Sequence, residues 1–166
     1  MKLSFLISRR RIFYLLVILA AVIFIFNLSQ MKVFEKKSKK LARIIFNNEV
    51  EIRAEVLKTL PEKIKGLSGR KKILPDEGAL FVYQEPGFYN FWMKGMNFAI
   101  DIIWLIPDDK QKGIFKVVDI TPEISPASFP QTFSSKIPSQ YILEVKAGFS
   151  KENDIKIGSK VKIQGL

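Results

Sequence analysis

The sequence contains neither cysteine nor histidine among its 166 residues. Without cysteine there is no disulfide framework, no thiol nucleophile and no iron–sulfur site. Without histidine the Ser-His and Cys-His dyads and the usual zinc ligand sets are excluded. Any catalysis must therefore come from carboxylates, Lys, Arg, Tyr or Ser, and we expect no metal and no cofactor.

Other common signatures are missing as well. The chain has no Gly-rich phosphate loop, no carboxylate cluster with metal-ligand spacing and no Ser-x-x-Lys pattern. It also has no recognisable RNA- or DNA-binding motif, so we expect no nucleic-acid partner. These absences favour a binding or structural role over an enzyme.

Acidic residues are scarce, with 16 Asp and Glu against 27 Lys and Arg and a formal net charge of +11. The excess is uneven: residues 1–40 carry a net charge of +8, and residues 41–166 carry only +3. A basic domain of the nucleic-acid-binding kind is therefore not indicated. Most of the excess charge flanks one hydrophobic stretch.

That stretch, residues 12–28, reads IFYLLVILAAVIFIFNL. Seventeen residues of helix span roughly 26 Å, enough for a thin bilayer. The run lacks the small-x-small ending of a cleaved signal peptide, so we predict a single-pass signal anchor, preceded by a basic flank (1–11) and followed by a Lys-rich stalk (29–40).

The orientation of this anchor is left open by the flanking charges. Basic residues are more numerous after the apolar run, which favours a cytoplasmic C-terminal domain, whereas Arg9, Arg10 and Arg11 directly precede the run, which favours export. The stalk is either a solvated spacer or a contact with lipid headgroups of the bilayer.

Residues 41–166 suffice for one domain with its own core. Two alternating runs around Asn47-Asn48 predict a hairpin, and Thr59 to Gly66 predicts a short helix. Further strands are expected at 79–83, 90–93, 99–106, 114–120, 141–147 and 159–164, separated by turn signals. This pattern predicts a mainly β, compact antiparallel barrel or sandwich with short helices.

The segment between residues 121 and 139 contains four prolines, at positions 122, 126, 130 and 138. Proline cannot donate to a strand ladder, so we expect an extended loop here. The loop is either a plain connection or a binding loop carried on the β scaffold.

Asp101 is the most unusual polar residue, because it lies in the apolar run AIDIIWLI. Both faces of this strand are apolar, as expected for a strand covered on both sides. A carboxylate there must be met by a cation or by several hydrogen-bond donors. Asp101 either caps loop amides or pairs with Lys94 or Arg70, or it is a binding or catalytic residue.

Aromatic and methionine side chains are densest between residues 88 and 96. This cluster is either core packing or a surface that stacks on a ligand or partner. The candidate binding residues are Trp92, Lys94, Asp101 and Arg70, and the candidates for catalysis are Asp101 and Lys94.

At these residues the sequence resembles domain-of-unknown-function family number 192 over residues 42–164. The specific part is Phe91-Trp92-Met93-Lys94 followed by Asp101-Ile102-Ile103. Weaker matches are Glu55-Val56, Gly66-Leu67 with Arg70, Leu74-Pro75, Leu80-Phe81-Val82, Pro138-Ser139, Leu143-Glu144, Ala147-Gly148 and Ile157-Gly158.

The chain departs from the family pattern at Gly95-Met96, where relatives commonly have Asn-Thr, and it lacks the cysteines that many relatives have in the Pro-rich loop. The resemblance implies a compact, mainly β domain without an assigned activity. Because relatives resemble exported proteins, it also favours an extracytoplasmic C-terminal domain.

Three hypotheses follow for function. The first is a membrane-anchored, extracytoplasmic, non-enzymatic module that binds an envelope protein or a small-molecule ligand around Trp92, Lys94 and the Pro-rich loop. The second is a hydrolase or transferase with Asp101 as general base and Lys94 or Arg70 as anion stabilisers. The third is a purely structural assembly domain.

Overall fold

The computed structural model describes residues 9–35, 40–47 and 49–166. The chain divides into two compact units, 1–38 and 39–166. Much of the predicted basic flank and stalk (residues 1–8 and 36–39) and the turn residue Asn48 lie outside the described residues.

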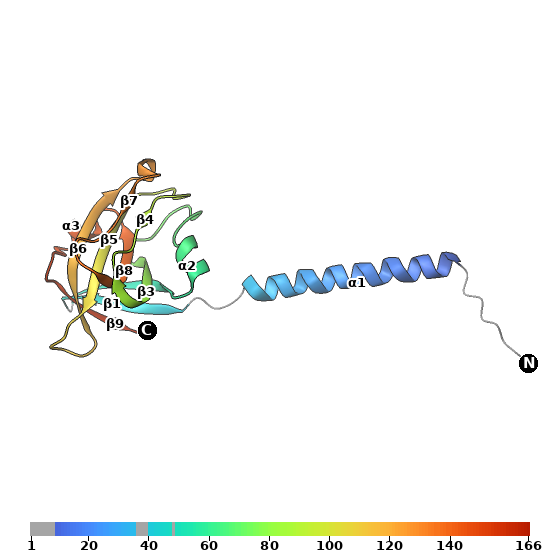
Figure 1. Cartoon of the computed structure of the whole chain (residues 1–166), viewed down its shortest axis with the longest axis horizontal. Helices are drawn as coiled ribbons and strands as arrows, with labels where there is room; N and C mark the ends of the chain where they lie inside the picture. Colours follow the sequence, from blue (N-terminus) through green and yellow to red (C-terminus); the bar gives the residue numbers. More distant parts are fainter. Residues whose placement is uncertain (1–8, 36–39, 48) are drawn as a thin grey trace, which may run out of the picture. The chain divides into compact units, whose positions relative to one another are not determined.

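The first unit contains one helix, α1 (Arg9–Glu35), which includes the apolar run (Figure 1). Over the described part of the chain, no helix combines the length and the hydropathy that a bilayer crossing requires. The predicted transmembrane helix is therefore not confirmed.

The second unit is a closed seven-stranded barrel with the strand order β1-β2-β3-β8-β5-β6-β9 (Figure 1). The barrel strands are β1 (Leu41–Phe46), β2 (Val50–Leu57), β3 (Glu77–Gly87), β5 (Ile100–Pro107), β6 (Ile114–Ile124), β8 (Ser139–Lys146) and β9 (Lys160–Gln164). The short strands β4 (Phe91–Trp92) and β7 (Thr132–Phe133) pair with each other outside the barrel. The mainly β prediction is confirmed.

The elements expected at the start of this domain are present. β1 and β2 form the predicted antiparallel hairpin, in which Ile52, Ala54 and Val56 point inward. Helix α2 (Leu60–Lys65) follows, and the Glu62 carboxylate accepts hydrogen bonds from the N–H groups of Lys58 and Thr59 at its start. Gly66 ends α2 with a φ of 46°, which a residue without Cβ adopts at little cost.

Two expectations need correction. β2 and β3 pair in parallel, although all other paired strands of the described structure are antiparallel. The Pro-rich segment is not all loop: β6 continues to Ile124, and its register against β5 shifts next to Pro122, where the missing N–H is tolerated. The same segment contains β7 and a 3₁₀ turn (Pro126–Ser128).

The sheet β3-β8-β5 is covered on both faces, as the sequence of β5 predicted. Side chains such as Ile103, Leu105 and Leu143 fill the barrel interior. The alternate residues, including Ile102, Trp104 and Ile142, belong to an outer layer that packs against residues of β4 and β7. We call these the inner core and the outer layer. Successive residues of β5 and β8 therefore serve two separate cores.

Candidate functional site

Asp101 is completely buried on the inner-core face of β5. Its Oδ1 accepts hydrogen bonds from the N–H groups of Glu123 (2.9 Å) and Gly148 (3.0 Å), and its Oδ2 accepts one from Ser150 N–H (2.9 Å). These donors lie at the end of β6 and at the start of α3 (Phe149–Glu152). Asp101 thus caps loop amides and holds two segments together, as one of the sequence interpretations stated.

The other candidates lie elsewhere. Arg70 forms an ion pair with Glu55 on β2, and its carbonyl oxygen accepts a hydrogen bond from Asn97 Nδ2 at 2.9 Å. Lys94 has an exposed side chain, and its carbonyl oxygen accepts a hydrogen bond from Ser68 Oγ at 2.7 Å. Among the described residues, neither basic side chain pairs with Asp101. The predicted binding residues are therefore not assembled around Asp101.

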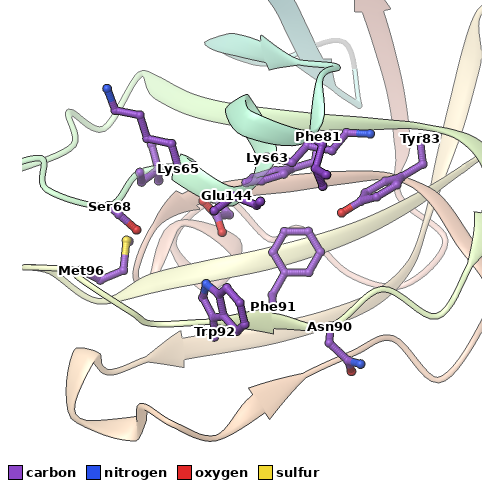
Figure 2. Close-up of a pocket in the computed structure, with 14 residues that line it drawn as sticks. Lys63, Lys65, Ser68, Phe81, Tyr83, Asn90, Phe91, Trp92, Met96 and Glu144 are labelled. Carbon is purple, nitrogen blue, oxygen red and sulfur yellow. The ribbon is translucent and has the colours of Figure 1, made fainter.

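Trp92 does line a cavity, which has a volume of about 210 Å³ and lies between α2 and the outer face of the barrel (Figure 2). Its walls are mostly apolar and aromatic. The lining residues are Leu60, Lys63, Ile64, Lys65, Gly66, Leu67, Ser68, Phe81, Tyr83, Asn90, Phe91, Trp92, Met96 and Glu144. No residue of the segment 121–139 lines it, so the Pro-rich segment contributes only by pairing β7 with β4.

Glu144 is the central polar residue of this cavity (Figure 2). It lies on β8 between Ala79 of β3 and Ile102 of β5 and is only 5% exposed. Its Oε2 accepts no hydrogen bond from the described residues. Burial raises the pKa of Glu144 to about 8, although the Arg70 guanidinium opposes this shift. The side chain is therefore mostly protonated at neutral pH.

Tyr83 and Lys63 form the adjoining wall. The ring of Tyr83 stacks on Tyr89 with a centroid distance of 3.4 Å, and Lys63 Nζ lies 3.8 Å from the centre of the Tyr83 ring. Burial, with smaller contributions from Tyr89 and Glu144, raises the pKa of Tyr83 to about 12. Burial lowers the pKa of Lys63, partly offset by Glu62. Tyr83 is thus neutral at physiological pH.

The segment that covers the cavity is strongly basic. Between residues 58 and 72 the chain has six basic side chains and one acidic one, Glu62. Glu62 is engaged in capping α2. The basic residues are Lys58, Lys63, Lys65, Arg70, Lys71 and Lys72. The cover therefore gives the cavity a positive surrounding potential.

Sequence reasoning did not identify Glu144 as a site residue. In YILEVKA the glutamate alternates with Leu143 and Val145, which is typical of a strand with one wet face. The local pattern does not show that residues of α2 and β4 lie over this face and form the walls of the cavity. The available sequence signal was the presence of Phe81 and Phe91 in two other predicted strands, 79–83 and 90–93.

The cavity contains one carboxyl group, several aromatic walls and basic side chains at its margin. A protonated carboxyl group in such a place donates a hydrogen bond, and an ionised one requires a cation. Either state suits the recognition of a small molecule with a polar group and an apolar body.

Comparisons with known proteins support the fold and the family. The family model DUF192, described as "Uncharacterized ACR", matches residues 43–163. No curated protein matches the chain.

Two solved structures are similar to this chain. One, a candidate transcription regulator from Sinorhizobium meliloti 1021, is 25% identical with a TM-score of 0.66, covering 78% of this chain and 96% of the other. The other, a protein of unknown function from Novosphingobium aromaticivorans DSM 12444, is 24% identical with a TM-score of 0.62, covering 74% and 83%.

Proposed function

We propose that this chain, which belongs to domain-of-unknown-function family 192, is a non-enzymatic module that binds a small-molecule ligand in the cavity beneath α2. The observation that carries the proposal is Glu144, a buried carboxyl group with one unpartnered oxygen facing an aromatic cavity. Burying such a group without a partner costs about 1–3 kcal/mol, which a ligand can recover.

The size and lining of the cavity support this function. A volume of about 210 Å³ exceeds the roughly 150 Å³ of an apolar cavity that admits benzene. Glu144 is the only carboxylate among the lining residues, so paired-carboxylate acid–base chemistry is not available there. Asp101, the residue considered as a general base, is sealed behind three N–H donors on the opposite face of the sheet.

The test uses the full chain labelled with 5-fluorotryptophan in phosphatidylcholine nanodiscs. The two tryptophans differ sharply, because Trp92 is 47% exposed at the cavity and Trp104 is fully buried. Benzyl alcohol, benzoate and benzylammonium are titrated separately while ¹⁹F spectra are recorded. We expect at least one probe to shift the Trp92 signal saturably while the Trp104 signal moves less.

The signals are assigned with Trp92→Phe. The matched control is Phe88→Ala, which removes an exposed aromatic ring that does not line the cavity and should leave the titration unchanged. The proposed function is wrong if none of the three probes shifts Trp92 at millimolar concentration.

We further propose that the chain is anchored in the cell membrane through residues 12–28, with the binding domain on the extracytoplasmic side. The support is the sequence: a 17-residue apolar run directly preceded by three arginines, and a family resemblance to exported proteins. The ligand would then be a molecule of the cell envelope.

Cell fractionation tests the anchoring. We expect the full chain to stay with membranes after alkaline carbonate extraction, and the variant lacking residues 1–38 to be released. External protease should degrade the C-terminal domain in cells whose outer layers are made permeable. Protection until the inner membrane is broken would show that the domain faces the cytoplasm.

A further inference from the structure

Resting on the proposed function, we infer that the cavity binds a small organic anion, a carboxylate with an apolar body of about one ring, and that protonated Glu144 donates a hydrogen bond to it. The ligand is thus negatively charged, and Glu144 binds it in the protonated form. Three features of the site carry it.

The first feature is the lack of a counter-ion for Glu144. Arg70, which is close enough to affect its pKa, is paired with Glu55. Lys63 lies against the ring of Tyr83. Among the described ion pairs none includes Glu144, and its Oε2 has no donor. An ionised Glu144 would thus be buried without compensation, whereas a protonated one has a free O–H.

The second feature is the charge of the cover. The six basic side chains between residues 58 and 72 attract an anion and repel a cation on its way to the cavity. Lys63 and Lys65 both line the cavity. Figure 2 shows the indole nitrogen of Trp92 turned to the side where Glu144 lies. The polar groups that a ligand meets are therefore mainly hydrogen-bond donors, and an anion can accept hydrogen bonds from them.

The third feature is the apolar wall formed by Phe81, Phe91 and Trp92. Phe81 and Phe91 are fixed edge to face with centroids 4.8 Å apart, so they form a rigid surface. A ring-sized group fits against it within about 210 Å³. The carboxylate end of the ligand then points to Glu144 and the apolar end to these rings.

The pH dependence of binding separates an anion from a cation. An anion that needs the Glu144 proton binds best below the pKa of about 8, and its affinity falls by up to about tenfold per pH unit above it. A cation that needs ionised Glu144 shows the opposite slope. The other titratable groups facing Glu144 are Tyr83 on β3, Lys63 and Lys65 on α2, and Arg70 after α2.

Tyr83, with its pKa near 12, stays neutral throughout the range that matters. Lys63, whose pKa is lowered, would also weaken anion binding as it loses its proton. The variant Lys63→Met removes that contribution. Any dependence of anion affinity on pH that remains near pH 8 in this variant is then due to Glu144.

The experiment titrates the full chain, in phosphatidylcholine nanodiscs, with benzoate, benzyl alcohol and benzylammonium between about pH 6.5 and 9.5. Benzoate should bind tightest, with a dissociation constant that rises about tenfold between about pH 8.5 and 9.5. Glu144→Gln, which keeps a neutral donor, should abolish this rise. Glu144→Leu, which has no donor, should weaken benzoate at about pH 7 by roughly tenfold.

Lys63→Met should weaken benzoate several-fold at neutral pH, whereas Lys156→Met, an exposed lysine away from the cavity, should not. Tighter binding of benzylammonium, strengthening as the pH rises, would overturn the anion inference and leave the ligand-binding function standing. A pH slope that persists in Glu144→Gln would also overturn it. If no probe binds, the proposed function itself fails.

Discussion

Asp101 and Glu144 are both buried carboxyl groups on the neighbouring strands β5 and β8, yet their surroundings are opposite. Asp101 pairs in register with Val145 and faces the inner core, and Glu144 pairs with Ile102 and faces the outer layer. Asp101 accepts three backbone hydrogen bonds, whereas one oxygen of Glu144 accepts none from the described residues.

The comparison shows that burial alone does not identify a functional carboxylate. The donors around Asp101 belong to the ends of β6 and α3, so its partners are supplied by the fold. The surroundings of Glu144 supply aromatic rings and a cavity instead, and its Oε2 has no hydrogen-bond donor among the described residues. The four predictions below test this difference.

The largest expected effect is at Asp101. Asp101→Ala leaves three buried N–H groups without an acceptor and should lower the free energy of unfolding by about 3–5 kcal/mol, or prevent folding. Denaturant unfolding measures the change. Asp109→Ala, which removes an exposed carboxylate from the turn between β5 and β6, is the matched control and should change stability by less than about 0.5 kcal/mol. Equal effects of the two substitutions would contradict the structural role of Asp101.

Glu144 should affect stability in a pH-dependent way. Its pKa is raised from 4.5 to about 8, so the unfolded chain loses this proton first as the pH rises. Stability is therefore lost between about pH 4.5 and 8 and is level above that, for a total of about 5 kcal/mol at the full shift.

Glu144→Gln should remove this loss. The difference in unfolding free energy between Glu144→Gln and the parent chain is measured from pH 4.5 to about 9 and should grow in favour of the variant. Parallel curves over this range would show that Glu144 titrates normally and is not the isolated carboxyl group described above.

Arg70 affects the Glu144 side of the comparison, because it stabilises the ionised form of Glu144 and also pairs with Glu55. Arg70→Met should lower stability by about 1–2 kcal/mol, intermediate between exposed and buried pairs. It should also raise the pKa of Glu144 further, which ¹³C NMR of the carboxyl group measures. The control is Arg53→Met, which breaks an exposed pair with Asp76 and should leave the Glu144 titration in place.

The smallest effect on stability is expected at Trp92. Because the ring is half exposed, Trp92→Ala should cost about 1 kcal/mol or less, while weakening the binding of a ring-shaped probe several-fold. Trp104→Ala, in contrast, removes a fully buried ring and should cost about 3–5 kcal/mol. A large loss of stability in Trp92→Ala without loss of probe binding would place Trp92 in the packing rather than in the site.

Much of the barrel could be predicted because its signals are local. The alternation of Val50, Ile52 and Ala54, the Thr59 to Gly66 helix and the two apolar faces of β5 each depend on a few consecutive residues. The parallel pairing of β2 with β3 and the bulge at Pro122 depend on which strands meet in space, and no local pattern contains that information.

The candidate site was predicted less well for the same reason. Trp92 was recognised through the aromatic run around it, and it does line the cavity. Asp101 was predicted as a candidate because it interrupts an apolar run. Its hydrogen-bond donors, however, are backbone N–H groups 22 to 49 positions away in the sequence. Glu144 looked like an ordinary solvent-facing strand residue, since its cover is made of α2 and β4, which are distant in the sequence.

The parallel pairing of β2 with β3 has a consequence for how this protein family can diversify. A chain that leaves one strand must travel back along the sheet before it can enter a parallel neighbour. Here the return path is residues 58–76, which include α2 and contribute Leu67 and Ile73 to the outer layer. Connectivity thus places a segment over Glu144, and under the proposed function an exchange of this crossover alters ligand selectivity while the strand ladder stays intact.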